Sequence, residues 1–321
     1  MVSAATPTSS GCSSPSRPRP DQTTNGLPAL APPMSVPGAP QGGGESMSQL
    51  DEVASTNRRF WENEVSQGSG YTRPWLELDP ALVRAFAAGD VDVLPEPYTY
   101  IYPQWLFHDV AQATAAGRPK DVLLLATGGG QQSAVFGLLG ANVTVYDLAE
   151  GQLAGDRLVA KHFGFPVRTI QGDMRDISVL ADESFDVVYQ EVSLGYVPDL
   201  LPVYRGVSRV LRPGGLYRVA HCEPVGMCVD EASWDGKGYR ISEPFYRGRV
   251  RGGSDSSMEF RHLLSDAFNG LIESGLVIRG VYEDPRHLIP TTAAPGTYAH
   301  LLTWGQIYYS IVAAKPAGGC A

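Results

Sequence analysis

The stretch Asp121–Asp147, DVLLLATGGGQQSAVFGLLGANVTVYD, constrains the fold of this chain more than any other. It opens with an uninterrupted apolar run over 122–125, which is typical of a buried strand. A glycine turn at 128–130 follows, and apolar residues then recur at helical spacing. The β-branched and aromatic run 143–146 predicts a second strand that ends at Asp147. The sequence therefore predicts an α/β protein whose doubly wound parallel sheet begins with this β-α-β unit.

The glycine turn and the acid at the second strand tip together predict a site for an adenosine-type cofactor. Glycines let the backbone approach a ligand that a Cβ atom would exclude, and the following helix directs free amides toward it. A carboxylate at the position of Asp147 can accept both hydroxyls of a ribose. The spacing Gly128-x-Gly130-x-x-Ser133 only approximates the dinucleotide fingerprint. The turn by itself leaves a nicotinamide cofactor and other adenosine cofactors open.

Composition narrows the class of partner. No run in the 321 residues reaches the roughly 18 apolar residues of a membrane span, so no membrane association is expected. The net charge of −9 argues against nucleic acid, because binding to it needs a basic face. Four scattered cysteines fit neither a disulfide framework nor a zinc site. We therefore expect a cytoplasmic protein with free thiols, no bound metal and a small molecule as its partner.

The amino-terminal part of the chain divides into two segments. Residues 1–48 are rich in Pro, Ser, Thr, Ala and Gly, and they hold too little apolar surface to offset the entropy of ordering. A disordered tail without a secretory signal or an anchor is expected there. Residues 49–120 predict a helical and aromatic cap. One helix is expected to begin near Ser48 or Asp51, and two more are expected at 81–88 and 108–116.

Aromatic residues are concentrated between Leu94 and Phe107, where prolines argue against a regular element. Two interpretations of this segment remain open: the aromatic side chains line the lid of a pocket, or they pack as a rigid collar on the core. The candidate substrate contacts of this segment are Tyr98, Tyr100 and Trp105, and Tyr102 is a candidate for the chemistry.

Three further strands are predicted at 167–170, 185–189 and 216–220. In an open α/β sheet, ligands bind outside the carboxyl ends of the strands. Asp173 and Met174 follow the third strand, where the carboxylate could accept the exocyclic amine of a purine and the methionine could pack on its ring. The alternative is a loop acid that caps the next turn. Glu191 follows the fourth strand, at the edge where chemistry takes place.

Four features occur in the order and spacing of class I S-adenosylmethionine-dependent methyltransferases, which the chain resembles over about 51–321: the glycine turn, Asp147, Gly-Asp-Met at 172–174 and Leu-Arg-Pro-Gly-Gly at 211–215. The strings GGGQQS and NRRFW are similar to those of a bacterial small-molecule branch, which suggests secondary metabolism. The resemblance implies a Rossmann-like fold with seven strands, the last of them antiparallel, and S-adenosylmethionine as cofactor. Strands at 276–281 and 307–312 would complete this sheet.

The resemblance also places the cofactor. Its expected contacts are Thr127, Gly128, Gly129, Gly130, Gln132, Asp147, Leu148, Gly172, Asp173, Met174 and Gln190. One departure stands out: Ala126 occupies the place of the acid that usually begins the glycine motif, and Gln132 occupies the place of its third glycine. The methionine end of the cofactor must therefore be held by other groups. Candidates are the amides of Gln131 and Gln132, the carbonyls of Ala126 or Gln190, and the amino-terminal helix.

The methyltransferase domain, 121–321, contains a long insertion at 221–258 that is rich in glycine, aromatic residues and arginine. An insertion of this length usually has a functional reason, and a substrate lid is one. Its candidate substrate contacts are Trp234, Tyr239, Tyr246 and Arg247, where arginines could hold a phosphate or carboxylate. The alternative is a solvated basic loop.

Methyl transfer from a sulfonium needs positioning of the acceptor and exclusion of water, and a base only where the acceptor loses a proton. Glu191, His221 and Tyr102 are the candidate bases, in that order. The acceptor is open: an amine, phenol or carboxylic oxygen of a metabolite, or an isoprenoid diphosphate methylated on carbon, with Glu191 as base and Mg²⁺ as a second cofactor. A nicotinamide-dependent oxidoreductase and a non-catalytic cofactor-binding protein are the other hypotheses, and the amino-terminal helices could pair two chains.

Overall fold

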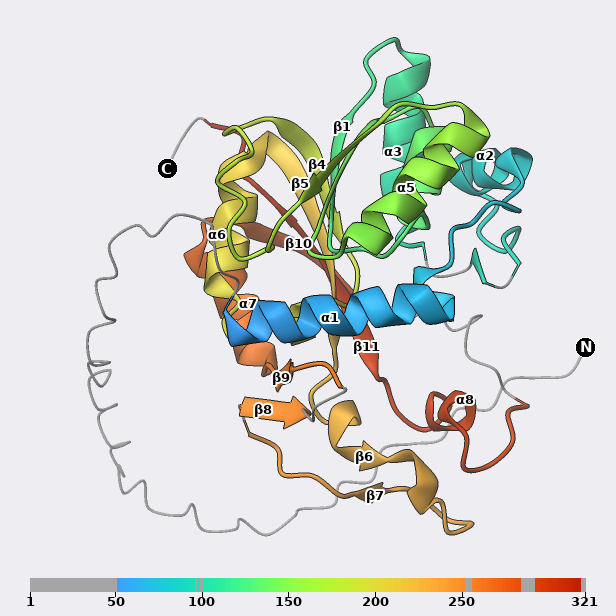
Figure 1. Cartoon of the computed structure of the whole chain (residues 1–321), viewed down its shortest axis with the longest axis vertical. Coiled ribbons are helices and arrows are strands. Elements are labelled where there is room, and N and C mark those ends of the chain that lie inside the picture. The colour runs from blue at the N-terminus through green and yellow to red at the C-terminus, as the bar shows by residue number, and fades with distance from the viewer. Residues whose placement is uncertain are drawn as a thin grey trace, which may run out of the picture. The chain divides into compact units, whose positions relative to one another are not determined.

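A sheet of seven strands in the order β10-β11-β5-β4-β1-β2-β3 forms the centre of the fold (Figure 1). The computed structural model describes residues 51–95, 97–98, 101–246, 248–251, 256–283 and 292–318, with 248–251 described by backbone alone. The strands of the sheet are β1 (Asp121–Leu125), β2 (Asn142–Asp147), β3 (Val167–Gln171), β4 (Phe185–Gln190), β5 (Leu211–Cys222), β10 (Val277–Glu283) and β11 (Tyr308–Ala314). Strands β1 to β5 pair in parallel, and β11 is antiparallel to both β5 and β10. The predicted fold class is confirmed; the predicted tail 1–48 lies outside the described residues.

Helices cover both faces of the sheet (Figure 1). Along β1, Val122 and Leu124 join one buried cluster while Leu123 and Leu125 join the other, as the two-residue period of a strand requires. The first cluster includes residues of α2 (Pro80–Ala88), α3 (Gln104–Ala115), α4 (Gln132–Leu138) and α5 (Glu150–Phe163). The second includes residues of α6 (Leu201–Val210) and α7 (Leu264–Glu273).

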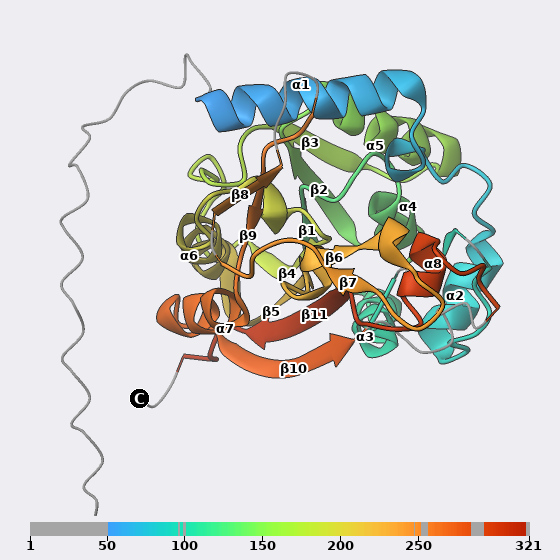
Figure 2. The same ribbon diagram turned by 90° about the horizontal axis from the view of Figure 1, so that it is seen from below.

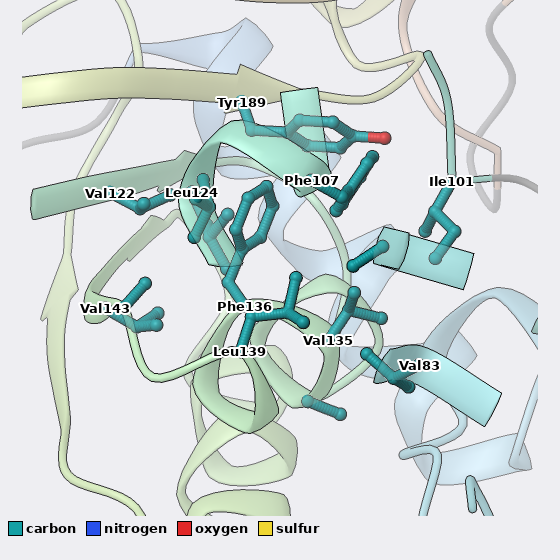
Figure 3. Packing of buried hydrophobic residues seen from close by; sticks show 14 of the residues in the cluster. Val83, Ile101, Phe107, Val122, Leu124, Val135, Phe136, Leu139, Val143 and Tyr189 are labelled. Atoms are coloured by element: carbon teal, nitrogen blue, oxygen red, sulfur yellow. The ribbon is translucent and has the colours of Figure 1, made fainter. Parts of the chain in front are cut away.

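Aromatic rings fill the first cluster between the sheet and its helices. Phe107 of α3 stacks on Phe136 of α4 with ring centroids 5.0 Å apart, and both rings meet Tyr189 of β4 edge-on (Figure 3). Each such side chain, once fully buried, contributes about 1.5–3 kcal/mol through the hydrophobic effect. This packing fixes the strand tips from which the site is built.

Helix α1 (Glu52–Gln67) lies across the end of the sheet (Figures 1 and 2). Asp51 caps its amino terminus by accepting from the backbone N–H of Ala54 at 2.9 Å, and Gly68 ends it in the left-handed conformation. The side chain of Asn57 is buried and bonds the backbone of Tyr196 and Met258. These bonds hold the helix in place from its middle.

Short elements complete the fold. They are η1 (Gly70–Thr72), η3 (Leu194–Tyr196), η4 (Gly226–Cys228), β6 (Val229–Asp230), η5 (Glu231–Ser233), β7 (Arg240–Ile241), β8 (Gly248–Arg251), β9 (Glu259–Arg261) and α8 (Tyr298–Leu301). The insertion 221–258 therefore contains one small antiparallel ribbon, β6 with β7, and its strand β8 pairs antiparallel with β9, which follows the insertion.

The predicted bounds of two elements are wrong. Helix α3 begins at Gln104, directly after Pro103, and not at His108. Strand β5 begins at Leu211 and continues to Cys222, and not over 216–220 alone, so it includes both the Leu-Arg-Pro-Gly-Gly motif at 211–215 and His221. The pairing with β4 shifts register between Phe185 and Val187, and this irregularity accommodates a proline and two glycines inside a strand.

Candidate active site

A cavity of about 680 Å³ lies at the carboxyl edge of the sheet. It is lined by the residues that follow β1, β2, β3 and β4, by the end of β5 and by the start of β11, which is antiparallel and so begins at this edge. Helix α1 contributes Val53, Ala54, Asn57 and Trp61 to the lining. The position agrees with the rule that open α/β sheets bind ligands outside the carboxyl ends of their strands.

The tips of β1, β2 and β3 carry most of the predicted cofactor contacts. Those that line the cavity are Thr127, Gly128, Gln132, Asp147, Leu148, Gly172, Asp173 and Met174. Gly172 is required by packing, because a Cβ atom there would lie 2.0 Å from the hydroxyl of Tyr146. That hydroxyl donates to the carbonyl oxygen of Asp176 at 2.7 Å and so fixes the loop that holds Asp173.

The three glycines of the turn have different roles. Gly128 lines the cavity with a φ of 88°, a backbone conformation that favours glycine. Gly129 and Gly130 lie behind it against α5, where a Cβ atom on Gly130 would be 2.6 Å from the carbonyl oxygen of Gly155. The backbone N–H of Gly130 also donates to the buried carboxyl of Asp156 at 2.9 Å. Only the first glycine is placed to meet a ligand; the other two let the turn approach the helix.

Asp147 is buried at the tip of β2 and lines the cavity. The backbone N–H of Ala149 donates to its Oδ1 at 2.9 Å. Burial raises the pKa of this carboxyl from 3.8 to about 7, against the opposing effect of the backbone hydrogen bonds. Glu62 of α1 accepts from the backbone N–H groups of Glu150 and Gly151, and so caps the first turn of α5 beside it. A ligand with two hydroxyls would supply the donors that an ionised Asp147 lacks.

Three buried oxygen atoms beside the glycine turn have no hydrogen-bond partner among the described residues. They are Oγ1 of Thr127 and the side-chain Oε1 atoms of Gln132 and Gln152, and all three residues line the cavity. A buried polar atom without a partner costs about 1–3 kcal/mol, so these three oxygens are available to accept hydrogen bonds from a ligand in the cavity. The amide of Gln131, by contrast, donates to the carbonyls of Gly70 and Arg73 and holds η1.

Two predicted cofactor contacts are engaged within the protein. Asp173 receives bonds from the Arg175 guanidinium at 3.0 Å, and Arg175 also pairs with Asp51 at 2.8 Å. The side chain of Gln190 is buried, where it donates to Met174 Sδ at 3.2 Å and accepts from Tyr217 at 2.5 Å. Gln190 therefore supports the lining from behind.

Glu191 follows β4 directly and lines the cavity. In the sheet, β4 lies between β1, β2 and β3 on one side and β5 and β11 on the other. Oε2 of Glu191 lies 2.7 Å from Nη1 of Arg218, a side chain of β5 with no exposed surface. The guanidinium is enclosed by the rings of Tyr102 and Tyr189, with Cζ 4.7 Å and 4.5 Å from their centroids, and it donates to the Tyr102 carbonyl at 3.0 Å. One oxygen of Glu191 is thus fixed by a buried cation.

The other half of the cavity, above β5 and β11, is lined by aromatic residues. Four tyrosines belong to it: Tyr71, Tyr196, Tyr298 and Tyr308, accompanied by Cys222, Met227, Glu259 and Leu302. Trp61 of α1 meets Tyr196 edge-on at 5.5 Å. Burial raises the pKa of Tyr196 and of Tyr298 far above the ordinary value of 10.0, so both phenols stay protonated.

One relative matches most of the chain. The uncharacterized methyltransferase YbaJ of Bacillus subtilis (strain 168) is 30% identical over 245 residues, which make up 73% of this chain and 92% of that protein. Residues 123–219 also match the family model described as a methyltransferase domain. The chain belongs to the class I S-adenosylmethionine-dependent methyltransferases. S-adenosylmethionine, the cofactor that the sequence predicted, is the cofactor of this family.

Two further proteins are similar to the chain. A ubiquinone biosynthesis O-methyltransferase of Pseudomonas syringae pv. tomato is 38% identical over 104 residues, which span 32% of this chain and 44% of that protein. The solved 1,6-didemethyltoxoflavin-N1-methyltransferase of Burkholderia thailandensis superposes with a TM-score of 0.50 at 16% identity, over 85% of this chain and 93% of that chain. The second similarity concerns the fold alone.

Of the other two candidate bases of the methyltransferase, His221 does not line the cavity. Neighbouring residues of β5 alternate between the faces of the sheet, so Ala220 and Cys222 reach the cavity while His221 points to α6. Its Nε2 lies 3.1 Å from the Tyr204 hydroxyl, and burial lowers its pKa to about 3. Tyr102 lines the cavity, and its hydroxyl accepts from Ser310 at 3.1 Å.

The predicted substrate contacts lie outside the cavity wherever the structure describes them. Tyr98 packs edge-on against Trp75 at 5.1 Å, which agrees with the collar interpretation, and the Trp105 indole donates to the Tyr282 hydroxyl. Trp234 and Tyr239 pack with each other and with residues near α8. Tyr246 is exposed. Tyr100 and Arg247 lie outside the described residues.

Sequence reasoning missed Arg218 and the four tyrosines. A charged residue in the middle of the apolar run 216–220 was a usable signal, because an arginine there must be paired. Tyr308 could have been found from the antiparallel direction of the last strand, which brings its first residue to the carboxyl edge. Nothing in the local sequence marks Tyr71, Tyr196 or Tyr298.

In the described part of the chain, no helix is long and apolar enough to cross a membrane. No group of three or more His, Cys, Asp or Glu side chains within it is arranged to hold a metal ion.

Proposed function

We propose that the protein transfers a methyl group from S-adenosylmethionine to a small-molecule acceptor, with the cofactor above β1, β2 and β3 and the acceptor above β5 and β11. The observation that carries this proposal is the division of one cavity at Glu191. Residues with buried, unpartnered oxygens and the Asp147 carboxyl lie on one side, and an aromatic wall lies on the other. A volume of about 680 Å³ is in the range of sites that enclose ligands of this kind.

The residues of the cofactor half fit S-adenosylmethionine group by group. Asp147 would accept the ribose hydroxyls, and Met174 would pack against the purine. The unpartnered oxygens of Thr127, Gln132 and Gln152 would accept hydrogen bonds from the ammonium of the methionine end. They would thus take the role of the acid that is missing at Ala126. When bound, the cofactor supplies an electrophilic methyl group to the boundary between the halves.

Glu191 has two tasks in this proposal. Its pairing with Arg218 fixes the carboxylate at the boundary, so it can orient an acceptor hydroxyl or amine by accepting a hydrogen bond. Where the acceptor carries a proton that must leave, the same carboxylate receives it. Helix α1 covers the cavity, which keeps water from the reacting atoms.

One relative suggests oxygen as the methylated atom. Its printed name, ubiquinone biosynthesis O-methyltransferase, refers to that atom. An isoprenoid diphosphate with Mg²⁺ is not favoured. Arg175 is the single basic side chain among the described lining residues, and it is bound by Asp51 and Asp173.

Calorimetric titration with S-adenosylhomocysteine tests the proposal. We expect micromolar binding, and Asp147→Ala should weaken it at least about a hundredfold, because two charge-assisted hydrogen bonds are lost. Asp109→Ala is the matched control, since that carboxylate forms a surface pair with Lys120. Absence of binding to the wild-type protein would contradict the proposal. Binding without release of S-adenosylhomocysteine from S-adenosylmethionine, across phenol, amine and carboxylate acceptors, would favour a non-catalytic binding protein.

A further inference from the structure

We propose that Trp234 and Tyr239 of the insertion position the acceptor indirectly, by holding α8 as a wall of the acceptor half of the cavity, which lies above β5 and β11. This inference rests on the proposed function and gives the insertion a role in it. It is carried by a cluster of aromatic side chains outside the cavity, here called the aromatic clasp, which consists of Trp234, Tyr239, His300 and Trp304.

Helix α8 has two faces with different partners. The backbone N–H of Leu302 donates to the carbonyl oxygen of Tyr298 at 3.0 Å, so the helical turn includes Leu302. With roughly 3.6 residues per turn, residues four apart share a face and residues two apart lie on opposite faces. Tyr298 and Leu302 line the cavity. His300 and Trp304 lie on the opposite face and belong to the clasp.

The position of α8 depends on tertiary contacts. The helix has four residues, and a helix this short has little stability by itself. It lies beside the ribbon of β6 and β7 (Figures 1 and 2). The ring centroid of Trp234 lies 4.7 Å from those of both His300 and Trp304. The Tyr239 hydroxyl is hydrogen-bonded to Nδ1 of His300 at 2.5 Å, so the clasp holds α8 from the side opposite the cavity.

The insertion provides a fixed frame for the clasp. At its base, the backbone N–H of Glu223 donates to the carbonyl oxygen of Ile307 at 2.7 Å, which ties the insertion to the residue before β11. The backbone N–H of Arg240 donates to Oγ of Ser233 at 2.8 Å and closes the loop that carries both insertion residues of the clasp. Helix α8 is therefore held between this frame and the cavity.

The wall that the clasp holds belongs to the acceptor half alone. The hydroxyls of Tyr298 and Tyr308 are hydrogen-bonded to each other, which connects α8 to the start of β11. None of the four clasp residues, all of which the structure describes, lines the cavity. Loss of the clasp should therefore weaken acceptor binding and leave cofactor binding unchanged.

Calorimetric titration of catechol into protein saturated with S-adenosylhomocysteine tests the inference. Catechol is the probe because its flat ring and its hydroxyls suit a wall of tyrosines. Trp234→Ala should weaken catechol binding at least about tenfold and change S-adenosylhomocysteine binding by less than about twofold. Trp234→Phe keeps a ring and should restore most of the affinity. Tyr239→Phe removes one hydrogen bond and should weaken catechol about threefold.

Trp105→Ala is the matched control, because this partly exposed tryptophan lies outside the cavity and bonds Tyr282 of β10. Alkylation by iodoacetamide supplies a second measurement that needs no acceptor. Cys222 lines the acceptor half, whereas Cys228 is buried in the insertion. Trp234→Ala should raise the alkylation rate of Cys222 several-fold and leave Cys228 unreactive, as followed by peptide mass spectrometry.

Unchanged catechol affinity together with an unchanged Cys222 rate would overturn the inference. Equal weakening of both ligands, or equal alkylation of both cysteines, would overturn it as well, because the substitution would then act on the whole fold. If wild-type protein does not bind catechol, the Cys222 rate decides alone. Failure of the wild-type protein to bind S-adenosylhomocysteine would instead overturn the proposed function, so the two outcomes are separable.

Discussion

The two halves of the cavity are built in different ways. The cofactor half is assembled from the tips of β1, β2 and β3, which are consecutive in the chain and whose residues follow directly from strand and turn patterns. The acceptor half is assembled from η1, η3, α8 and the first residue of β11, which are far apart in sequence. The comparison teaches that a sheet edge can supply a standard cofactor site while segments outside the sheet define what else the site accepts.

Breaking the Glu191–Arg218 ion pair, which lies between the halves, should have the largest effect on the free energy of unfolding. Arg218→Leu removes the buried cation beside Glu191 together with its hydrogen bonds to the carbonyls of Tyr102 and Gln190. We expect the free energy of unfolding to fall by about 3–5 kcal/mol, because the partners remain buried without compensation. Chemical denaturation measures this change.

The control for that substitution is Arg157→Leu, which breaks an exposed pair with Glu150. Its effect should stay within about 1 kcal/mol, as for surface pairs in general. If the two substitutions destabilise the protein equally, the Glu191–Arg218 pair is not the structural boundary described above.

The glycine turn offers a way to damage the cofactor half alone. Gly130→Ala introduces a Cβ atom 2.6 Å from the carbonyl oxygen of Gly155 at a φ of 85°, and we expect a loss of about 2–4 kcal/mol from strain and overpacking. Gly164→Ala has a similar φ of 78° with open space around it, so about 1–2 kcal/mol is expected from backbone strain alone. Thermal unfolding of both variants compares them. Gly130→Ala should also weaken the binding of S-adenosylhomocysteine more than the binding of catechol. The reverse order would contradict the assignment of the glycine turn to the cofactor half.

The two halves should differ in pH dependence, which is the smallest expected effect. The pKa of Asp147 is raised by burial to about 7, so the carboxyl is protonated in the free protein below that value. Ribose hydroxyls bind the ionised form, and the affinity for S-adenosylhomocysteine should therefore rise about tenfold from pH 6 to pH 8. The affinity for catechol should not rise with pH in this way. Calorimetry at several pH values checks both, and a slope that persists in Asp147→Asn would contradict the assignment.

The same carboxyl links pH to stability in the free protein. Because its folded pKa lies above its ordinary value of 3.8, its contribution to stability is fully present below about pH 4 and is lost as the pH rises through about 7. Asp156, whose pKa burial raises to about 8, adds to this trend. The free protein should be less stable at pH 8 than at pH 5, and bound S-adenosylhomocysteine should reduce the difference.

The sequence predicted those parts of the fold and site that depend on local patterns. Strand tips, the seventh strand and most residues of the cofactor half follow from periodicity and from the resemblance to methyltransferases. The direction of a side chain near a strand end cannot be predicted while the end itself is unknown. For this reason the sequence offers His221 as a candidate base although it points away from the cavity. Tyr98 and Trp105 were selected by local density, but density does not show which face of a segment meets the core.

The tertiary contacts of α1 were also beyond the sequence. Asn57 bonds residues 196 and 258, and Glu62 caps the first turn of α5, so each acts on a part of the chain about 90 residues or more away. Such contacts depend on how the helix lies across the sheet edge, and hydrophobic spacing gives no information about that.

The most direct test of the two-half cavity is a crossed titration. S-adenosylhomocysteine and catechol are each titrated into Asp147→Ala and into Tyr308→Leu. Thermal unfolding checks that both variants are folded. Catechol is added to Asp147→Ala in the absence of S-adenosylhomocysteine, and the result is compared with wild-type protein treated in the same way. The structure predicts that Asp147→Ala loses S-adenosylhomocysteine but keeps catechol, and that Tyr308→Leu does the opposite. Loss of both ligands in either folded variant, or the reverse pattern, would contradict the division of the cavity at Glu191.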